Sequence, residues 1–297
     1  MKRKIYITLI GGLGNQLFQY ACAFNLANNL NAKLIIDDKG GFFFDKKFQR
    51  NNSLPKNLSY EKANIFEISL LFVLRILKKI LFNKKFFLSL NNFALIDETQ
   101  EKKYISNFFD ITKNKEIIYL IGFFQSEKYF LNTKKLILKK IIQNKIKSKK
   151  LNQLKKTINK RSLMIGIRKF EEAPKFDRKK FGGIENFNFY NKNFKILEKK
   201  FKIKDNFVFS TLKNQIIFNK LKIKNISIIN SENSFFGRDL DYLIFFSLFK
   251  NFLISNSTFY YWGALISEYR FKKINIICSK KFINLDTKLK RWDKIYK

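Results

Sequence analysis

A glycine-rich turn near the N-terminus constrains the fold of this chain more than any other feature. The apolar run Ile5–Ile10 is typical of a β-strand, and the segment Gly11–Ala21, with the sequence GGLGNQLFQYA, opens a helix. A second apolar strand follows at residues 34–37, so the sequence predicts a βαβ unit with parallel strands. Such a turn brings backbone N–H groups and the positive end of a helix to one point, which favours binding of a phosphate.

The turn matches a dinucleotide-binding fingerprint only in part. A G-x-G-x-x-G pattern is satisfied by Gly12 and Gly14, but Leu17 stands where the third glycine belongs. Asp37 and Asp38 end the second strand, where an acid that binds a ribose would lie, so a nicotinamide-dependent enzyme is an alternative. A tight turn without any ligand is the other interpretation that these residues leave open.

Four segments resemble glycosyltransferase family 11, the α-1,2-fucosyltransferases, and occur in the order found in that family. The first is the glycine-rich turn itself. The others are Gly122–Phe130 (GFFQSEKYF), Ile165–Arg168 (IGIR) and Ser255–Ala264 (SNSTFYYWGA). Together they extend from residue 11 to residue 264, which is nearly the whole chain.

The resemblance implies a GT-B-type architecture, in which two Rossmann-like α/β domains face each other across a cleft. Strands that alternate with helices in both halves also favour an α/β fold with parallel sheets. We expect residues 1–160 to form an N-terminal α/β domain on the acceptor side, which carries the GGLGNQ loop. Residues 161–297 are expected to form a C-terminal Rossmann-like domain that binds the nucleotide sugar.

The chain departs from the family pattern at two places. The family strand H-x-R-R-G-D has Gly166 in place of its histidine here, and Arg168 is followed by Lys-Phe-Glu. The family's S-D-D segment is replaced by residues 210–212, Ser-Thr-Leu. These differences indicate a divergent branch, so the resemblance leaves open a donor sugar other than fucose.

The resemblance implies that Arg168 is catalytic. Transfer from a nucleotide diphosphate builds negative charge on the leaving pyrophosphate, and an arginine fork can neutralise it. Because the chain has no histidine, carboxylates are the candidates for a general base, and Glu171 aligns with the family's aspartate while Glu172 is adjacent. Surface ion pairs between Arg168 and these two acids are the structural alternative.

Donor binding is expected from both halves of the chain. From the first turn, we expect Gly12, Gly14 and Asn15 to approach the donor. From the second half, the expected binding residues are Arg168, Ser210, Thr211, Asn256, Ser257, Thr258 and Phe259. A plain helix cap and core packing are the alternatives for the last three. No D-x-D motif lies in a matched segment, so we expect no metal and no cofactor, with GDP-fucose as the donor substrate.

The composition narrows the range of partners. The chain has 297 residues and a net charge of +37, and lysine is frequent along its whole length without one dominant basic block. We therefore expect a nucleotide-sugar donor and a glycan acceptor, and no specific nucleic acid. The two cysteines, Cys22 and Cys278, indicate no disulfide framework, and Cys22 is expected in the core.

A helix is expected over residues 65–82, with Leu70, Leu74, Leu77 and Leu81 on its apolar face and Arg75, Lys78 and Lys79 opposite. We expect an ordinary surface helix, and a helix that lies on an anionic membrane is the alternative. The N-terminal apolar run is too short for a signal peptide, and no segment has the length of a membrane span. These features predict a cytoplasmic protein, with peripheral contact to the inner face of the membrane left open.

The sequence therefore predicts an inverting, metal-independent α-1,2-fucosyltransferase that uses GDP-fucose to build a surface glycan such as O-antigen or capsule. One alternative is the same fold with another sugar nucleotide. The second is a non-catalytic basic α/β module that binds nucleic acid or an anionic membrane.

Overall fold

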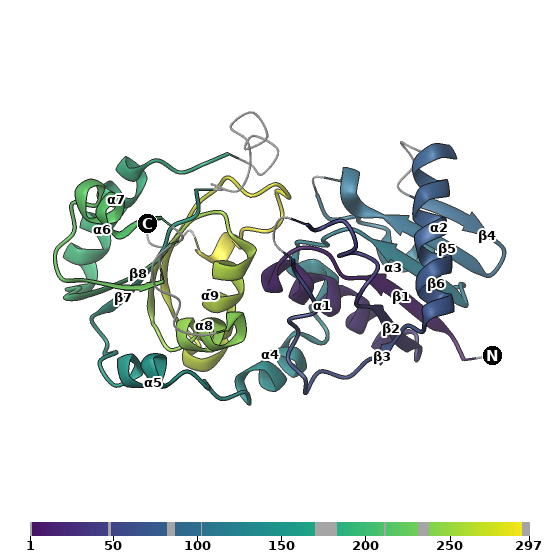
Figure 1. The fold of residues 1–297 in the computed structure, drawn as a ribbon, viewed down its shortest axis with the longest axis horizontal. Helices are drawn as coiled ribbons and strands as arrows, with labels where there is room; N and C mark the ends of the chain where they lie inside the picture. Colours follow the sequence, from purple (N-terminus) through teal and green to yellow (C-terminus); the bar gives the residue numbers. More distant parts are fainter. Residues whose placement is uncertain are drawn as a thin grey trace. The chain divides into compact units, whose positions relative to one another are not determined.

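The chain divides into two compact α/β units, Met1–Ile141 and Ile142–Lys297 (Figure 1). The computed structural model describes residues 2–46, 49–81, 87–101, 103–169, 183–210, 212–230 and 238–292. Each unit is built around a sheet of mostly parallel strands, as the alternation of strands and helices predicts.

The first unit contains a six-stranded sheet with the strand order β3-β2-β1-β6-β5-β4. All neighbouring strands are parallel except β4 and β5, which form an antiparallel hairpin. The strands are β1 (Lys4–Thr8), β2 (Lys33–Asp37), β3 (Glu61–Lys62), β4 (Phe87–Leu90), β5 (Phe93–Asp97) and β6 (Ile117–Ile121). The predicted βαβ unit is therefore confirmed: β1 and β2 are adjacent and parallel, and α1 (Leu13–Asn29) connects them.

Helices and short 3-10 turns complete the first unit. They are α2 (Ile65–Leu81), η1 (Glu98–Gln100), α3 (Phe108–Thr112), η2 (Glu127–Phe130) and α4 (Lys134–Ile142), whose last residue falls in the second unit. Helix α1 packs against β1 and β2 and is buried along most of its length. Cys22 lies in its buried part, as predicted, and burial raises the pKa of this thiol.

Helix α2 forms where the sequence predicts it, but the face with Leu70 and Leu77 does not pack on the sheet. Leu70 and Leu77 are exposed, whereas Ile68 and Leu71 pack on the sheet against a group that includes Tyr6, Ile35, Leu95 and Tyr119. Lys78, expected on the exposed side, is 6% exposed and pairs with Asp97 at the end of β5. Both sides of the helix are apolar, so helical spacing alone does not show which side faces the sheet.

The second unit contains a five-stranded, wholly parallel sheet with the order β11-β10-β7-β8-β9. Its strands are β7 (Ser162–Gly166), β8 (Asp205–Phe209), β9 (Ile226–Asn230), β10 (Asn251–Ile254) and β11 (Asn275–Cys278). Its helices are α5 (Lys149–Lys155), α6 (Phe187–Phe201), α7 (Asn214–Lys220), α8 (Asp239–Phe246) and α9 (Thr258–Phe271). Apolar residues of β7, β8, β10 and α6 form its core.

The boundary between the units lies earlier than residue 160. Residues 142–160 belong to the second unit, because α5 packs against α8 and Leu151 is fully buried there. The backbone N–H of Lys147 also donates a hydrogen bond of 2.9 Å to Oδ1 of Asp241. Within the described part of the chain, no helix is long and apolar enough to cross a bilayer.

Candidate functional site

The first candidate site is the glycine-rich turn at the carboxyl end of β1. Gly11 has a φ of +77°, a conformation that favours glycine. Gly12 is the N-cap of α1 and carries no side-chain cap, while the N–H of Asn15 donates to the carbonyl oxygen of Gly12 over 2.9 Å. The N–H groups of Leu13 and Gly14 come before these first backbone bonds of the helix. A Cβ atom on Gly12 would meet nothing within 4 Å, so the approach to these N–H groups is open. The arrangement suits an anionic group at the positive end of the helix.

The two family-like segments of the first unit lie side by side. Nε2 of Gln125 donates to Oδ1 of Asn15 over 3.0 Å, and Nε2 of Gln19 donates to the carbonyl oxygen of Gly122 over 3.0 Å. Gln16 bonds to the carbonyl oxygens of Gly11 and Asn51, each over 2.9 Å. The amide side chains of GGLGNQLFQYA thus hold the turn in place, and Gly14 is buried in the first turn of α1.

A buried carboxylate that sequence reasoning missed shapes the same edge of the sheet. Oε2 of Glu98 accepts hydrogen bonds from the backbone N–H groups of Phe123 and Phe124, both over 3.0 Å. Phe124 has a φ of +50°, so Glu98 stabilises an unusual backbone turn at the start of GFFQSEKYF. The signal in the sequence was an Asp-Glu pair at the end of an apolar strand.

The geometry of Asp37 and Asp38 does not support a nicotinamide enzyme. Both carboxylate oxygens of Asp37 are used within the fold, by Thr8 and by the N–H groups of residues 39 and 40. Asp38 pairs with Lys62 over 2.7 Å and accepts a bond from Asn52. Burial acts to raise the pKa of Asp38, but the bonds from Lys62 and Asn52 outweigh it and hold the pKa below its usual value.

The second candidate site is the carboxyl edge of the second sheet. Gly166, Phe209, Ile254 and Cys278 are paired in register at the ends of β7, β8, β10 and β11. The residues that follow these strands therefore emerge along one edge, where parallel α/β sheets bind ligands. They include the half-buried Arg168, then Ser210, then residues 256–258.

Several predicted binding residues have structural contacts at this edge. Nδ2 of Asn256 donates to the carbonyl oxygens of Gly183 and Lys281, over 3.1 and 2.7 Å, and so joins two loops. Oγ of Ser210 accepts a bond of 3.2 Å from the N–H of residue 212. Phe259 packs against Phe209 with ring centroids 6.0 Å apart. For Phe259, the packing interpretation fits this geometry better than contact with a donor.

Ser257 and Thr258 lie where α9 begins. Ser257 occupies the N-cap position, and its side chain makes no capping bond to the first turn of α9. Lys169 lies next to Arg168 in the sequence. Its ammonium lies 4.5 Å from the centre of the Phe187 ring and donates a hydrogen bond to the carbonyl oxygen of Glu185.

Three predicted site residues lie outside the described part of the chain: Thr211, Glu171 and Glu172.

Glu185 is a second carboxylate that sequence reasoning missed. Its Oε1 accepts a bond of 2.7 Å from Oγ of Ser279, and Nζ of Lys281 lies 3.2 Å from its Oε2. These contacts fasten the segment before α6 to the end of β11. No motif in the sequence singles out this glutamate.

Asp241, the second acid of the D-x-D sequence at residues 239–241, serves the fold at the start of α8. Asp241 is buried, and its carboxylate accepts bonds from the backbone N–H of Lys147 and from Arg238 in a capping box. Within the described ranges, no three carboxylate or thiol side chains lie close enough together to hold a metal ion.

Gly166, which replaces the family's histidine, is covered by an aromatic ring. A Cβ atom there would lie 2.7 Å from the ring of Tyr260, whose hydroxyl donates to the carbonyl oxygens of Ile167 and Phe209. The space for a side chain at residue 166 is therefore filled by α9.

This packing predicts that Gly166→Ala destabilises the protein. Because the ring of Tyr260 must move, we expect a loss of about 1–3 kcal/mol in the free energy of unfolding. Gly12→Ala is the matched control, since its Cβ meets nothing within 4 Å and its φ is −79°. Urea unfolding of both variants measures the difference, and equal stability of the two would contradict the packing argument.

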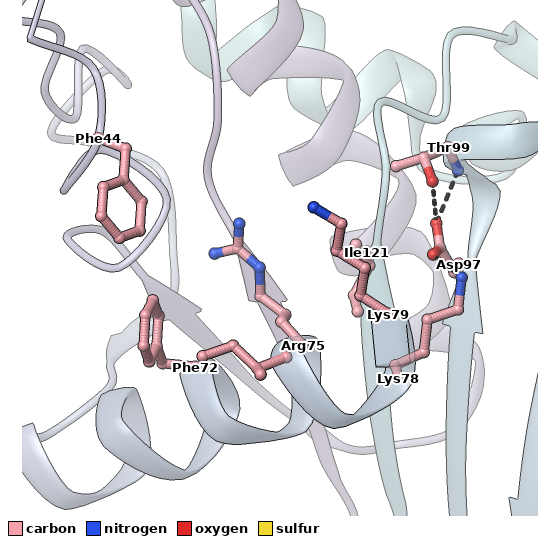
Figure 2. A pocket seen from close by; sticks show the side chains of 9 residues that line it. Phe44, Phe72, Arg75, Lys78, Lys79, Asp97, Thr99 and Ile121 are labelled. Atoms are coloured by element: carbon pink, nitrogen blue, oxygen red, sulfur yellow. Dashed lines mark hydrogen bonds and ion pairs between the residues drawn. The ribbon is translucent and has the colours of Figure 1, made fainter. Parts of the chain in front are cut away.

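A pocket of about 510 Å³ lies in the first unit, beside α2 (Figure 2). In Figure 2, the guanidinium of Arg75 and the ammonium of Lys79 lie between two phenyl rings, Phe44 and Phe72, on one side and Asp97 on the other. The carboxylate of Asp97 is engaged by Lys78 and by the backbone and hydroxyl of Thr99.

The comparisons with known proteins agree with this architecture. No protein-family model matches the chain. An alpha-1,2-colitosyltransferase of Escherichia coli is 26% identical over 88% of this chain and 87% of its own length. The O-antigen biosynthesis glycosyltransferase WbnK of Escherichia coli is 26% identical over 90% of this chain and 92% of its own. This chain is a glycosyltransferase.

The solved structures identify the fold of this glycosyltransferase. A mutant of Arabidopsis thaliana FUT1 in complex with GDP superimposes with a TM-score of 0.50 and 12% identity. The match covers 90% of this chain and 68% of that chain. Two units with parallel α/β sheets and this likeness confirm the predicted GT-B-type fold.

Proposed function

We propose that the enzyme is of the family 11 type and transfers L-fucose from GDP-fucose to a glycan hydroxyl in an α-1,2 linkage. The observation that carries this proposal is the edge of the second sheet, where Arg168, Ser257 and the start of α9 follow neighbouring strands. The glycan would be an O-antigen or another surface polysaccharide, in keeping with the name of one relative.

The proposed reaction is a single displacement. The acceptor hydroxyl attacks the anomeric carbon on the face opposite GDP, the bond to the pyrophosphate oxygen breaks, and the configuration inverts. The fork of Arg168 and the first N–H groups of α9 stabilise the negative charge that develops on GDP. The proton of the acceptor passes to a carboxylate, for which Glu171 and Glu172 are the candidates. In this proposal the reaction uses neither a metal ion nor a cofactor.

Colitose is the second candidate for the transferred sugar. It is fucose that lacks one hydroxyl group, and one relative is named as a colitosyltransferase with the same linkage. The replacement of S-D-D by Ser-Thr-Leu at residues 210–212 fits a change in the donor site. A donor assay with GDP-fucose and GDP-colitose distinguishes the two sugars.

GDP-fucose should stabilise the fold more than any UDP- or CMP-sugar does. A ligand at a hundred times its dissociation constant adds about 2.7 kcal/mol, which is on the order of several degrees in the melting temperature. A thermal-shift series with GDP, GDP-fucose, UDP-galactose and CMP-sialic acid measures this.

Two results of that series would change the proposal. Stabilisation by a UDP-sugar alone would exclude GDP-fucose and leave only the fold. Stabilisation by an oligonucleotide with none from any sugar nucleotide would favour the basic binding module instead.

A further inference from the structure

Helix α2 presents an apolar face to the solvent. Its exposed large apolar side chains are Ile65, Phe66, Leu70, Val73, Ile76, Leu77 and Ile80. At about 100° per residue they form, with Ser69, one continuous arc of roughly 140°, and no charged residue of α2 falls within that arc. Phe66 and Ile80 are 77% and 70% exposed, near the two ends of the helix. Apolar patches of this kind mark a surface that binds something.

The helix itself is firmly placed, so the exposed face is a property of the fold. Asn64 and Glu67 cap its N-terminus reciprocally, over 2.9 and 3.0 Å. Tyr6 donates to Glu67 over 2.8 Å, and Lys78 pairs with Asp97 beneath the helix. These contacts orient the opposite side of α2 toward the sheet.

The pocket of Figure 2 borders one margin of this apolar face. Ile76 belongs to both, and Phe72, Arg75 and Lys79 follow around the helix. Within the described residues, no carboxylate lies within ion-pair distance of Arg75 or Lys79, whereas Lys78 is neutralised by Asp97. Two cations therefore face the pocket beside two phenyl rings, which are 6.1 Å apart between centroids.

We propose that α2 docks the enzyme on an anionic phospholipid surface. The apolar face enters the boundary between headgroups and acyl chains, and the pocket takes a lipid phosphate between Arg75 and Lys79. Charge complementarity favours an anionic phospholipid surface as the partner of this face. The chain carries a net charge of +37, and Arg75 and Lys79 border the apolar face, so an anionic bilayer attracts this side of the protein.

Sedimentation with vesicles tests the proposal on the full chain. Vesicles with equal parts of phosphatidylcholine and phosphatidylglycerol should bind the protein at least about tenfold more strongly than pure phosphatidylcholine vesicles. Phe66→Gln/Ile80→Gln should lower binding to the anionic vesicles at least about tenfold, because two large apolar side chains no longer enter the bilayer. Arg75→Gln/Lys79→Gln should lower it by a similar factor.

Matched variants in the same unit serve as controls. Lys135→Gln/Lys139→Gln removes the same charge from exposed positions of α4, and Leu90→Gln/Leu136→Gln removes two exposed leucines away from α2. Both should reduce binding far less than the α2 variants. Circular dichroism melting of every variant shows that its fold is retained.

Three results would overturn the proposal. The first is vesicle binding that the α2 variants leave unchanged. The second is binding of inorganic phosphate in the pocket without any binding to vesicles. The third is a dimer, seen by light scattering, that Phe66→Gln/Ile80→Gln converts to a monomer, because that result would assign the face to a second copy of the chain.

Discussion

Arg168→Ala should slow sugar transfer by at least about a hundredfold. Arg168 follows β7 at the edge of the second sheet where the start of α9 also lies, and we propose that its guanidinium meets the leaving pyrophosphate. Loss of an electrostatic contact made mainly in the transition state typically costs on the order of 3 kcal/mol. The measurement is kcat for GDP release with GDP-fucose and an acceptor glycan. The loss should appear in kcat as well as in kcat/KM.

Two further variants make this prediction specific. Arg168→Lys should also be slow, because an ammonium cannot form the planar two-point contact of a guanidinium. Lys169→Ala should matter far less, since the ammonium of Lys169 lies over Phe187 and bonds to the carbonyl oxygen of Glu185. Near-normal turnover by a folded Arg168→Ala enzyme, or a larger loss in Lys169→Ala, would move the pyrophosphate contact to another residue.

Lys78→Met should destabilise the first unit by about 3–5 kcal/mol. Both side chains of the Lys78–Asp97 pair are less than a tenth exposed, and removing the ammonium leaves a buried carboxylate without its countercharge. Urea unfolding that reports on the first unit measures the loss.

The neighbouring residue supplies a close control for this prediction. Lys79→Met changes an exposed lysine on the same turn of α2 and should alter stability by only about 0.5 kcal/mol. Lys78→Met/Asp97→Leu should recover part of the loss, because no charge is then left buried. Equal unfolding midpoints for Lys78→Met and Lys79→Met would show that the pair contributes nothing to stability.

The sequence predicted those parts of the fold that local pattern determines. The strands β1 and β2 and the alternation of strands with helices in both halves were expected, because buried parallel strands are continuous apolar runs between turns. The β4–β5 hairpin and β11 were missed. The hairpin had a signal, since two asparagines separate two apolar runs and Asn91 has a φ of +34°.

The orientation of α2 depended on tertiary contacts that no local pattern contains. Both sides of this helix are apolar, so its periodicity fits either orientation, and the buried partner of Lys78 lies 19 residues further along the chain. The domain boundary was placed at residue 160 for a related reason. No local pattern assigns residues 142–160 to either half, but Leu151 of this segment packs into the second unit.

The sequence predicted which segments contribute to the candidate site, but it predicted few of the contacts that their side chains make. The resemblance to family 11 identified the segments GGLGNQLFQYA and GFFQSEKYF. In the structure these segments meet through Asn15 and Gln125, two residues that are 110 positions apart in the sequence. The resemblance also showed that Gly166 departs from the family pattern. Only the structure reveals that Tyr260 fills the vacated space, and that Glu98 and Glu185 hold the neighbouring loops.

The most direct test of the central claim is a donor assay on the purified chain in EDTA. GDP-fucose, GDP-colitose, UDP-galactose and CMP-sialic acid are each supplied with a panel of acceptor glycans, and nucleotide release and product linkage are measured. We expect acceptor-dependent release of GDP from GDP-fucose and an α-1,2-linked product. Turnover of only the UDP- or CMP-sugar, or activity that requires added Mn²⁺, would contradict it.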